Sequence, residues 1–315
     1  MSKYRHLFGP VNSRRLGLSL GVDLAPFKYC SLNCVYCEVQ RTTDLLVERA
    51  EYIEIDGVLA ELDKALAQKP HLDYITFSGA GEPTLNSGIG RVIQHIKTHY
   101  PEYKLALLTN GTLLYDKQLR DEVIPCDLIL PSLDAASQAS FEKINRPHPQ
   151  LKVETLIQSL TDLRREYQGQ IWLEVFIIQG ISDVPEELEA LIAAIEQIKP
   201  DLVQLNALDR PGAEEWVQAA PPELLHSIQR LFSARLTMPV EVIAKAALPV
   251  LQPVSDDFIS QIRAVLLRRP CTAEDLSVTL GTHINEVSKI LRELNLQGKL
   301  SVKREARGVF YLWKE

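Results

Sequence analysis

The 315-residue sequence lacks the features that mark membrane, secreted and nucleic-acid-coating proteins. It has no run of about 18 apolar residues that could cross a membrane, and no apolar secretory signal in "MSKYRHLFGPVNSRR". Its net charge is −7, which argues against nonspecific coating of nucleic acid but leaves room for a local basic patch. We therefore expect a cytoplasmic protein without membrane association, built from one large domain or one large and one small domain.

Cysteine is also scarce, because the chain has only five and they do not form a disulfide framework. Three of them lie together in "CSLNCVYC", at Cys30, Cys34 and Cys37, with the spacing C-x3-C-x2-C. Cys126 precedes an apolar segment and Cys271 begins a helical one, so we expect both to be buried and inert. The three clustered thiols indicate metal or redox chemistry.

The cluster of three thiols lacks the fourth ligand that a structural zinc site normally draws from a second cysteine pair. A nearby His or Asp would have to complete such a site. An iron–sulfur cluster is the alternative, since a 4Fe–4S cluster held by three thiolates leaves one iron without a protein ligand. That iron can bind a small chelating molecule. The missing second pair favours the iron–sulfur alternative.

Short apolar runs rich in strand-forming residues alternate with amphipathic helical patterns over about the first 245 residues. Six alternating strand and helix units predict an α/β fold with a parallel sheet, a partial (β/α)6 TIM-like barrel over residues 1–248. In such folds the chemistry lies at the carboxyl ends of the strands. The predicted strands are Leu18–Leu24, Tyr74–Phe77, Lys104–Leu108, Leu128–Pro131, Trp172–Ile178 and Leu202–Asn206. The predicted helices lie within residues 55–68, 90–100, 151–167 and 185–199.

A second, smaller domain is expected at residues 255–315, after the proline-containing linker "AKAALPVLQPVSDD" at 244–257. Its pattern predicts helices at 256–269, 272–281 and 282–295, followed by strands at 300–304 and 308–313. Thr272 and Thr282 have the residue type of helix N-caps, and Gly281 and Gly298 that of terminators. Three helices and a two-stranded hairpin predict a winged helix.

Polar residues and glycines follow the predicted strands where those strands end. Each group has a simpler explanation, since glycine suits a tight turn and Ser, Thr, Asn and Asp suit helix caps. Because the carboxyl ends of parallel strands meet at one rim, however, a single shared site explains all of them together. The residues are Gly79, Gly81, Glu82 and Pro83 after the second strand, Thr109 and Asn110 after the third, and Ser132 and Asp134 after the fourth.

The cysteine motif and the second strand end resemble the radical S-adenosylmethionine (SAM) superfamily. Its motif is C-x3-C-x-aromatic-C, and Tyr36 supplies the aromatic residue before Cys37. The segment "SGAGEP" is similar to the Gly-Gly-Glu loop of that superfamily, with Ala80 in place of one glycine. Over residues 9–210 the chain looks like the branch that includes the archaeal enzymes of wyosine synthesis on tRNA. Those enzymes carry a second set of cluster cysteines that this chain lacks, so wyosine synthesis itself is not expected.

The resemblance implies a 4Fe–4S cluster on Cys30, Cys34 and Cys37, with the amino and carboxylate groups of SAM on the open iron. An electron from a flavodoxin-type or ferredoxin-type donor would break SAM to a 5′-deoxyadenosyl radical, which removes hydrogen from an unidentified substrate, a peptide, a protein or an RNA base. The residues expected around the cofactor are Tyr36, Gly79, Gly81, Glu82, Pro83, Thr109, Asn110, Ser132, Asp134 and Asn206.

Further polar residues near the predicted rim are candidates for substrate contact. Arg146, in "KINRP", is the proposed catalytic residue, and its alternative is a surface charge. His148 has the context of a loop histidine, and Glu174 lies either inside the barrel or on the outer face of its strand. The weaker candidates to clamp an anionic group or contact the substrate are Arg14, Arg15, Asp209 and Arg210.

The predicted winged helix leaves three alternatives: docking of a protein or peptide, nucleic-acid binding, and packing within the chain. Its third helix carries Lys289 and Arg292, offset by Glu286 and Glu293, whereas the hairpin is basic, with Lys299, Lys303, Arg304 and Arg307. A transcriptional regulator that senses redox state through an iron–sulfur cluster is therefore the rival hypothesis. It has no use for the glycine–glutamate loop or for the polar strand ends.

Overall fold

The computed structural model describes residues 4–243 and 258–314, and its centre is one large sheet. The six predicted strands lie side by side in the order of the sequence, and each is parallel to its neighbour. This confirms the α/β fold with a mostly parallel sheet. The strands are β2 (Gly17–Val22), β5 (Tyr74–Phe77), β6 (Leu105–Thr109), β7 (Leu128–Pro131), β8 (Gln170–Phe176) and β9 (Leu202–Asn206).

Two further strands, which the sequence patterns do not predict, extend this sheet at its edges. β1 (Leu7–Ser13) pairs antiparallel with β2, and β10 (Val240–Val242) pairs parallel with β9. Within the described residues this sheet is therefore parallel except at the β1 edge. Neither added strand has a clear sequence signal, because "LFGPVNS" contains Gly-Pro, a turn-type pair, and β10 is only three residues long.

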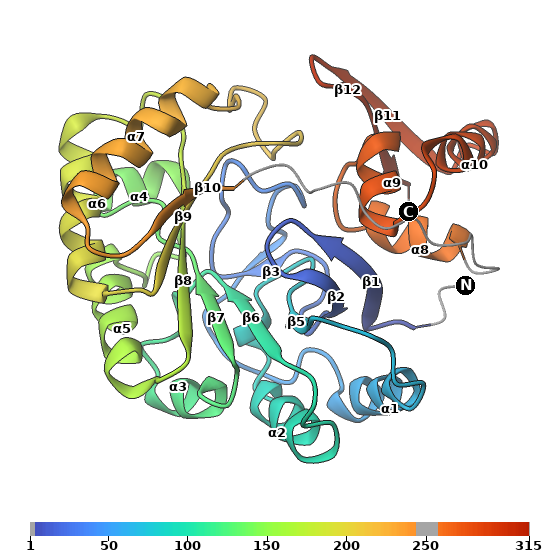
Figure 1. Cartoon of the computed structure of the whole chain (residues 1–315), viewed down its shortest axis with the longest axis horizontal. Coiled ribbons are helices and arrows are strands. Elements are labelled where there is room, and N and C mark those ends of the chain that lie inside the picture. Colours follow the sequence, from blue (N-terminus) through green and yellow to red (C-terminus); the bar gives the residue numbers. More distant parts are fainter. Residues whose placement is uncertain (1–3, 244–257, 315) are drawn as a thin grey trace.

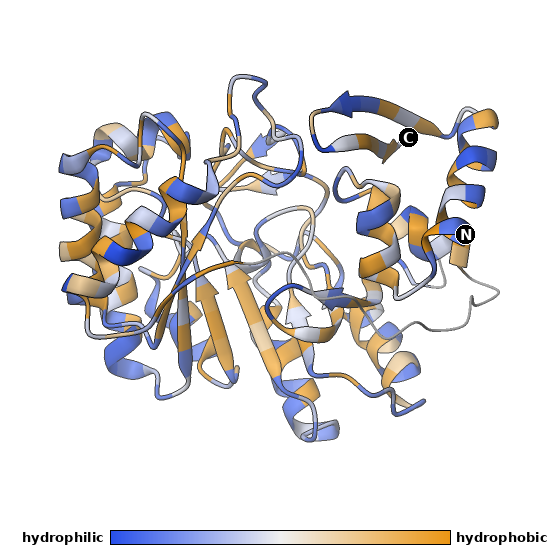
Figure 2. Ribbon diagram, turned by 45° about the horizontal axis from the view of Figure 1, so that its top comes forward, coloured by the Kyte–Doolittle hydropathy of each residue, from blue (hydrophilic) through white to orange (hydrophobic). Residues whose placement is uncertain are grey.

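Helices cover the outer face of the curved sheet (Figure 1). α1 (Ile55–Leu66) shows why the predicted helices form, because Ile55, Val58, Leu62 and Leu66 fall on one face and are all buried. The strands beneath are largely apolar (Figure 2). The other helices of this region are α2 (Ile89–His99), α3 (Lys117–Val123), α4 (Gln138–Ile144), α5 (Val153–Glu166), α6 (Pro185–Ile198) and α7 (Pro222–Arg235). Of these, α3, α4 and α7 are not among the predicted helices.

The C-terminal unit has its own hydrophobic core, to which Ile262, Leu276 and Leu291 belong. Its elements are α8 (Phe258–Leu266), α9 (Ala273–Leu280), α10 (Ile284–Leu296), β11 (Leu300–Glu305) and β12 (Gly308–Trp313). Three helices followed by a hairpin match the predicted order. That this unit is a winged helix stays our interpretation, as does the division into domains at 1–248 and 255–315. The linker at 244–257 lies outside the described residues.

The ends of the C-terminal helices test the predicted caps. Thr272 caps α9 through a capping box with Asp275, and Gly281 ends it in the left-handed conformation, with φ of 62°. The prediction for Thr282 is wrong, because His283 caps α10 by accepting a hydrogen bond from the amide of Asn285. Thr282 is instead buried. Gly298, with φ of 71°, follows α10 as expected.

The C-terminal unit packs against the β1 edge of the sheet (Figure 1). Val11 of β1 contacts the core of the unit, and the Asn12 side chain donates a hydrogen bond to the carbonyl of Val278 at 3.1 Å. Arg268 pairs with Asp23, which follows β2. Strand β1 therefore joins the sheet to the C-terminal unit. Among the helices of the described residues, none is long and apolar enough to span a membrane.

Candidate functional site

The three clustered cysteines lie on the loop that follows β2, starting in the short strand β3 (Tyr29–Cys30), which pairs with β4 (Asp44–Leu45). Each sulfur accepts a hydrogen bond from a different side-chain nitrogen. The Lys28 ammonium lies 3.3 Å from Cys37 Sγ, the Asn110 amide 3.5 Å from Cys30 Sγ, and the Asn145 amide 3.4 Å from Cys34 Sγ. Donors from three segments therefore surround the sulfurs, as suits thiolates that carry negative charge.

Burial disfavours the thiolate form of two of these cysteines. Burial, and then the nearby Glu82, raises the pKa of Cys30 to about 12, and burial likewise raises the pKa of Cys34. Metal binding replaces the thiol proton, so iron would convert these groups to thiolates. Within the described ranges, no three His, Cys, Asp or Glu side chains are gathered closely enough to hold a single metal ion.

Tyr36 and Asp134 belong to one buried hydrogen-bonded group beside Cys34. The Tyr36 ring stacks on Phe176, with centroids 3.8 Å apart, and its hydroxyl donates to Asp134 at 2.5 Å. The Asn145 amide also donates to Asp134, at 2.7 Å, as does the amide of Phe176, at 3.0 Å. Burial raises the pKa of Asp134 to about 6. This carboxyl group therefore orients both the aromatic residue and the donor to Cys34.

Glu82 joins the ends of β5 and β6. Its buried carboxylate accepts hydrogen bonds from the backbone amide and the hydroxyl of Thr84. It also accepts from the Thr109 hydroxyl at 2.7 Å and from the backbone amide of Asn110 at 2.8 Å. Burial raises the pKa of Glu82 despite these donors. The side chain is thus occupied within the protein, and it sets the position of Asn110, the donor to Cys30. Pro83 begins the short 3-10 helix Pro83–Leu85 and is buried.

The glycines of this loop allow close packing against the segment that carries the cysteines. A Cβ atom on Gly81 would lie 2.3 Å from the Tyr29 carbonyl oxygen, and one on Gly79 would lie 2.0 Å from a carboxylate oxygen of Asp23. Any side chain at either position would displace the backbone or the carboxylate. Glycine is required here because two strand ends approach each other closely.

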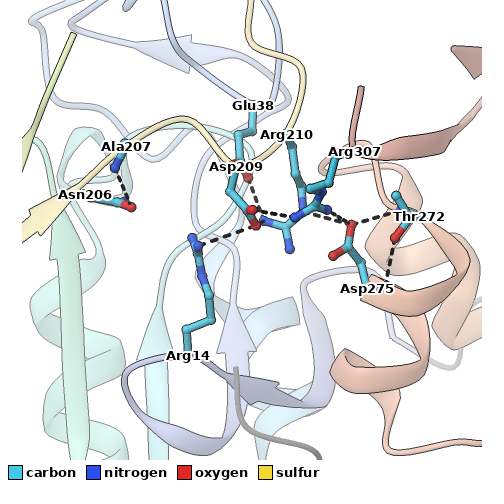
Figure 3. A network of polar contacts seen from close by, with 9 residues as sticks. All are labelled: Arg14, Glu38, Asn206, Ala207, Asp209, Arg210, Thr272, Asp275 and Arg307. Atoms are coloured by element: carbon cyan, nitrogen blue, oxygen red, sulfur yellow. Dashed lines mark hydrogen bonds and ion pairs between the residues drawn. The ribbon is translucent and has the colours of Figure 1, made fainter. Parts of the chain in front are cut away.

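Ser132 and Asn206 lie at the ends of β7 and β9, and within the described residues the side chain of neither one bonds the groups around the cysteines. The amide of Ser132 donates to the Thr109 carbonyl, and the buried Asn206 side chain accepts from the amide of Ala207 (Figure 3). Of the predicted rim residues, the structure therefore brings together Tyr36, Glu82, Thr109, Asn110 and Asp134. A cofactor contact by Ser132 or Asn206 stays a prediction.

Arg146 anchors a loop against the segment that carries the cysteines. It has a positive φ of 44°, its guanidinium donates to Glu214 at 2.5 Å, and its carbonyl accepts from the amide of Asn33 at 3.2 Å. A catalytic role for Arg146 stays a prediction. His148 is a loop residue whose ring accepts from the amide of Gln150.

Charged residues link the barrel to the C-terminal unit in a continuous network (Figure 3). Arg210, whose side chain is 5% exposed, pairs with Glu38 at 3.1 Å, and Glu38 directly follows Cys37. Arg307 of the hairpin turn bonds Asp209 and Asp275. The network therefore runs from the cysteine loop to the hairpin. Of the three alternatives for the C-terminal unit, packing within the chain is the one that agrees with these contacts of Arg307.

Residues Arg14 and Arg15 form the connection between β1 and β2. Arg15 pairs with Glu174 of β8, so the two partners meet across the sheet and Glu174 points to its inner side rather than to solvent. Both arginines line cavities next to the sheet.

The sequence patterns do not indicate that Lys28, Asn110 and Asn145 all donate to the cysteine sulfurs. Nor do they indicate that Phe176 stacks on Tyr36. Lys28 stands two residues before Cys30, and Asn145 stands directly before Arg146 in "KINRP", so proximity to motifs was the available signal. Asn110 was a candidate, but its contact with a sulfur was not foreseen. Phe176 carries no signal beyond that of an apolar strand residue.

Comparisons with known proteins agree with this geometry. The family model described as "Radical SAM superfamily" matches residues 24–195. The chain is 30% identical over 308 residues to a UPF0026 protein from Helicobacter pylori, covering 97% of this chain and 96% of that protein. It is 34% identical over 301 residues to a Brachyspira hyodysenteriae protein named GTPase Obg, covering 95% of this chain but only 44% of that protein.

Among solved structures, a radical SAM methyltransferase from Sphaerobacter thermophilus is similar with a TM-score of 0.54 and 19% identity. The similarity covers 71% of this chain and 66% of that chain. At this level of identity the likeness concerns the fold alone.

Proposed function

Because the chain belongs to the radical SAM superfamily, we propose that Cys30, Cys34 and Cys37 hold a 4Fe–4S cluster whose open iron binds SAM. The chain is a radical SAM enzyme, and its substrate is open. The observation that carries the proposal is the set of three sulfurs that each accept an N–H from Lys28, Asn110 or Asn145. Hydrogen bonds to cluster sulfurs are one of the means by which a protein sets the reduction potential of a cluster.

When bound, the cluster and SAM supply a 5′-deoxyadenosyl radical that removes a hydrogen atom from a substrate. The residues of this chain provide position and shielding. Asp134 holds the side chains of Tyr36 and Asn145, and Glu82 holds the backbone amide of Asn110, so these hydrogen bonds fix the groups around the cysteines. Gly79 and Gly81 let the loop after β5 pack directly against the cysteine segment.

The proposal extends to the partners of the reaction. A low-potential donor of the flavodoxin or ferredoxin type would reduce the cluster, and the substrate would be a peptide, a protein, an RNA base or a small molecule. We place the enzyme in the cytoplasm, where thiols stay reduced. The rival hypothesis of a redox-sensing regulator would need a basic hairpin free to bind nucleic acid, and one of its arginines, Arg307, is engaged within the chain.

The test is SAM cleavage by protein reconstituted with iron and sulfide under anaerobic conditions and reduced with dithionite. Wild-type protein is expected to form 5′-deoxyadenosine, detected by chromatography, and Cys34→Ala is expected to form none. Cys126→Ala is the matched control, because Cys126 is buried away from the motif and should leave cleavage intact. Stoichiometric iron with no 5′-deoxyadenosine from the wild type would contradict the proposal.

A further inference from the structure

A cavity of about 400 Å³ lies between the barrel and the C-terminal unit. Its walls include Ser19 and Thr76 from the sheet, and Arg268 and Val278 from the C-terminal unit. It also borders the proposed cofactor position, because Gly79 of the glycine–glutamate loop lines it. A volume of this size fits a small molecule, since such sites usually measure about 300–1,000 Å³.

The cavity contains more N–H donors than the described residues can satisfy. The Arg14 side chain is 23% exposed, and within the described residues it forms an ion pair with an oxygen of Asp209 at 3.6 Å, which is too long for a hydrogen bond. A guanidinium carries five N–H donors, so Arg14 retains most of its capacity. The Nε atoms of Arg210 and Arg307 are buried and have no hydrogen-bond partner among the described residues, and Arg210 Nε lies 3.7 Å from Asp275 Oδ2, beyond hydrogen-bond distance.

Of the four carboxylates that line the same cavity, Glu38, Asp209 and Asp275 are already engaged by other arginines, and Glu274 is the fourth. Arg210 pairs with Glu38, and Arg307 bonds Asp209 and Asp275 (Figure 3). Arg14 therefore shares with Arg307 a carboxylate that Arg307 holds more closely. Burial lowers the pKa of Arg14, against the attraction of Glu38, which agrees with a guanidinium charge that its surroundings only partly balance.

We infer that this cavity is a substrate subsite, and that Arg14 binds there an anionic group, a phosphate or a carboxylate, of a small molecule. The inference rests on the proposed function in that the bound molecule would be the substrate of the radical reaction. Arginine suits both groups, because its planar donors match two oxygens at once. Arg210 and Arg307 line the same cavity and add positive charge to its wall.

The test is equilibrium binding of two probe anions, orthophosphate and malonate, to the full chain containing its cluster. Wild-type protein should bind at least one of them, and the preferred probe identifies phosphate or carboxylate chemistry. Arg14→Gln should weaken that binding at least tenfold, whereas Arg14→Lys, which keeps the charge but not the paired donors, should lose less. The matched control is Arg235→Ala. Arg235 is the last residue of α7 and forms an exposed ion pair with Glu189 of α6, so this variant should bind like the wild type.

A second measurement avoids variants altogether, because phenylglyoxal modifies accessible arginines. The preferred anion should protect Arg14 in wild-type protein, as located by mass spectrometry, and should leave Arg235 unprotected. Lack of binding by the wild type, equal binding by wild type and Arg14→Gln, or unprotected Arg14 would each overturn the inference. Competition between the probe and SAM would also overturn it, because the anion site would then belong to the cofactor. Since binding needs no reduction, these outcomes are separate from a failure to cleave SAM.

Discussion

The ammonium of Lys28 is buried against a sulfur of the cysteine motif, and removing its charge should lower the reduction potential of the cluster. Lys28 is only 2% exposed, and its Nζ atom lies 3.3 Å from Cys37 Sγ. Within the described residues no carboxylate forms an ion pair with it, so the positive charge acts mainly on the sulfur. Reduction adds negative charge to the cluster, which a neighbouring cation stabilises.

The size of this effect follows from the strength of the contact. A hydrogen bond involving a charged group contributes about 1.5–3 kcal/mol. For a one-electron couple, about 1.4 kcal/mol corresponds to ~59 mV, so the contact can shift the potential by up to about 60–130 mV. We therefore expect Lys28→Met to make the midpoint potential more negative by an amount within that limit, and Lys28→Arg to keep most of the wild-type value.

The assay is a redox titration followed by electron paramagnetic resonance, on protein reconstituted to equal iron content. Lys117→Met is the matched control, because this exposed lysine pairs with Asp121 on α3 and should leave the potential unchanged. An unaltered potential in Lys28→Met, with the cluster fully present, would refute the reasoning. It would mean that the sulfur does not sense the ammonium.

Three further predictions concern buried carboxyl groups and the hairpin. Burial raises the pKa of Asp134 from 3.8 to about 6, so its stabilising contribution is present below about pH 4 and lost as the pH rises through 6. Between pH 4 and pH 6.5, urea denaturation of metal-free protein should therefore show the wild type losing ~2 kcal/mol of unfolding free energy relative to Asp134→Asn; parallel pH profiles would count against this. Glu82→Ala should lower the free energy of unfolding by ~3 kcal/mol or more in the same assay, because it leaves buried donors without an acceptor, and Glu82→Gln should cost less. Arg307→Ala should raise amide hydrogen exchange in β11 and β12 about tenfold, through loss of the bonds to Asp209 and Asp275, whereas Arg304→Ala on the exposed hairpin should not; equal exchange in both variants would argue against the contact.

The central strands could be predicted from sequence because their apolar runs are short, continuous and separated by helical patterns. Tyr74–Phe77 and Leu128–Pro131 have the predicted bounds, since a strand covered on both faces needs no polar alternation. The edge strand β1 has no such pattern. It is held by pairing with β2 and by contact of Val11 with the C-terminal unit, and neither can be read from its own residues.

The candidate site was predictable where chemistry depends on a local motif. Cys30, Cys34 and Cys37 are recognised by spacing, and the glycines by the strand end they follow. The donors to the sulfurs come from positions far apart in the chain, with Asn145 111 residues from Cys34. A contact of that kind depends on how strand ends meet in space, so the roles of Asn145 and Glu82 could not be derived from local pattern.

Two arginines of the hairpin show how the fold divides residues that the sequence treats alike. Arg304 and Arg307 stand three positions apart in a basic segment, and composition gives both the same potential to bind a nucleic acid. The structure leaves Arg304 exposed, whereas Arg307 bonds Asp209 of the loop after β9 and Asp275 of α9. Asp209 also pairs with Arg14, so the hairpin turn contributes to the wall of the cavity beside the cysteine loop. The hairpin arginine therefore bonds the same carboxylate that pairs with Arg14 in the wall of that cavity.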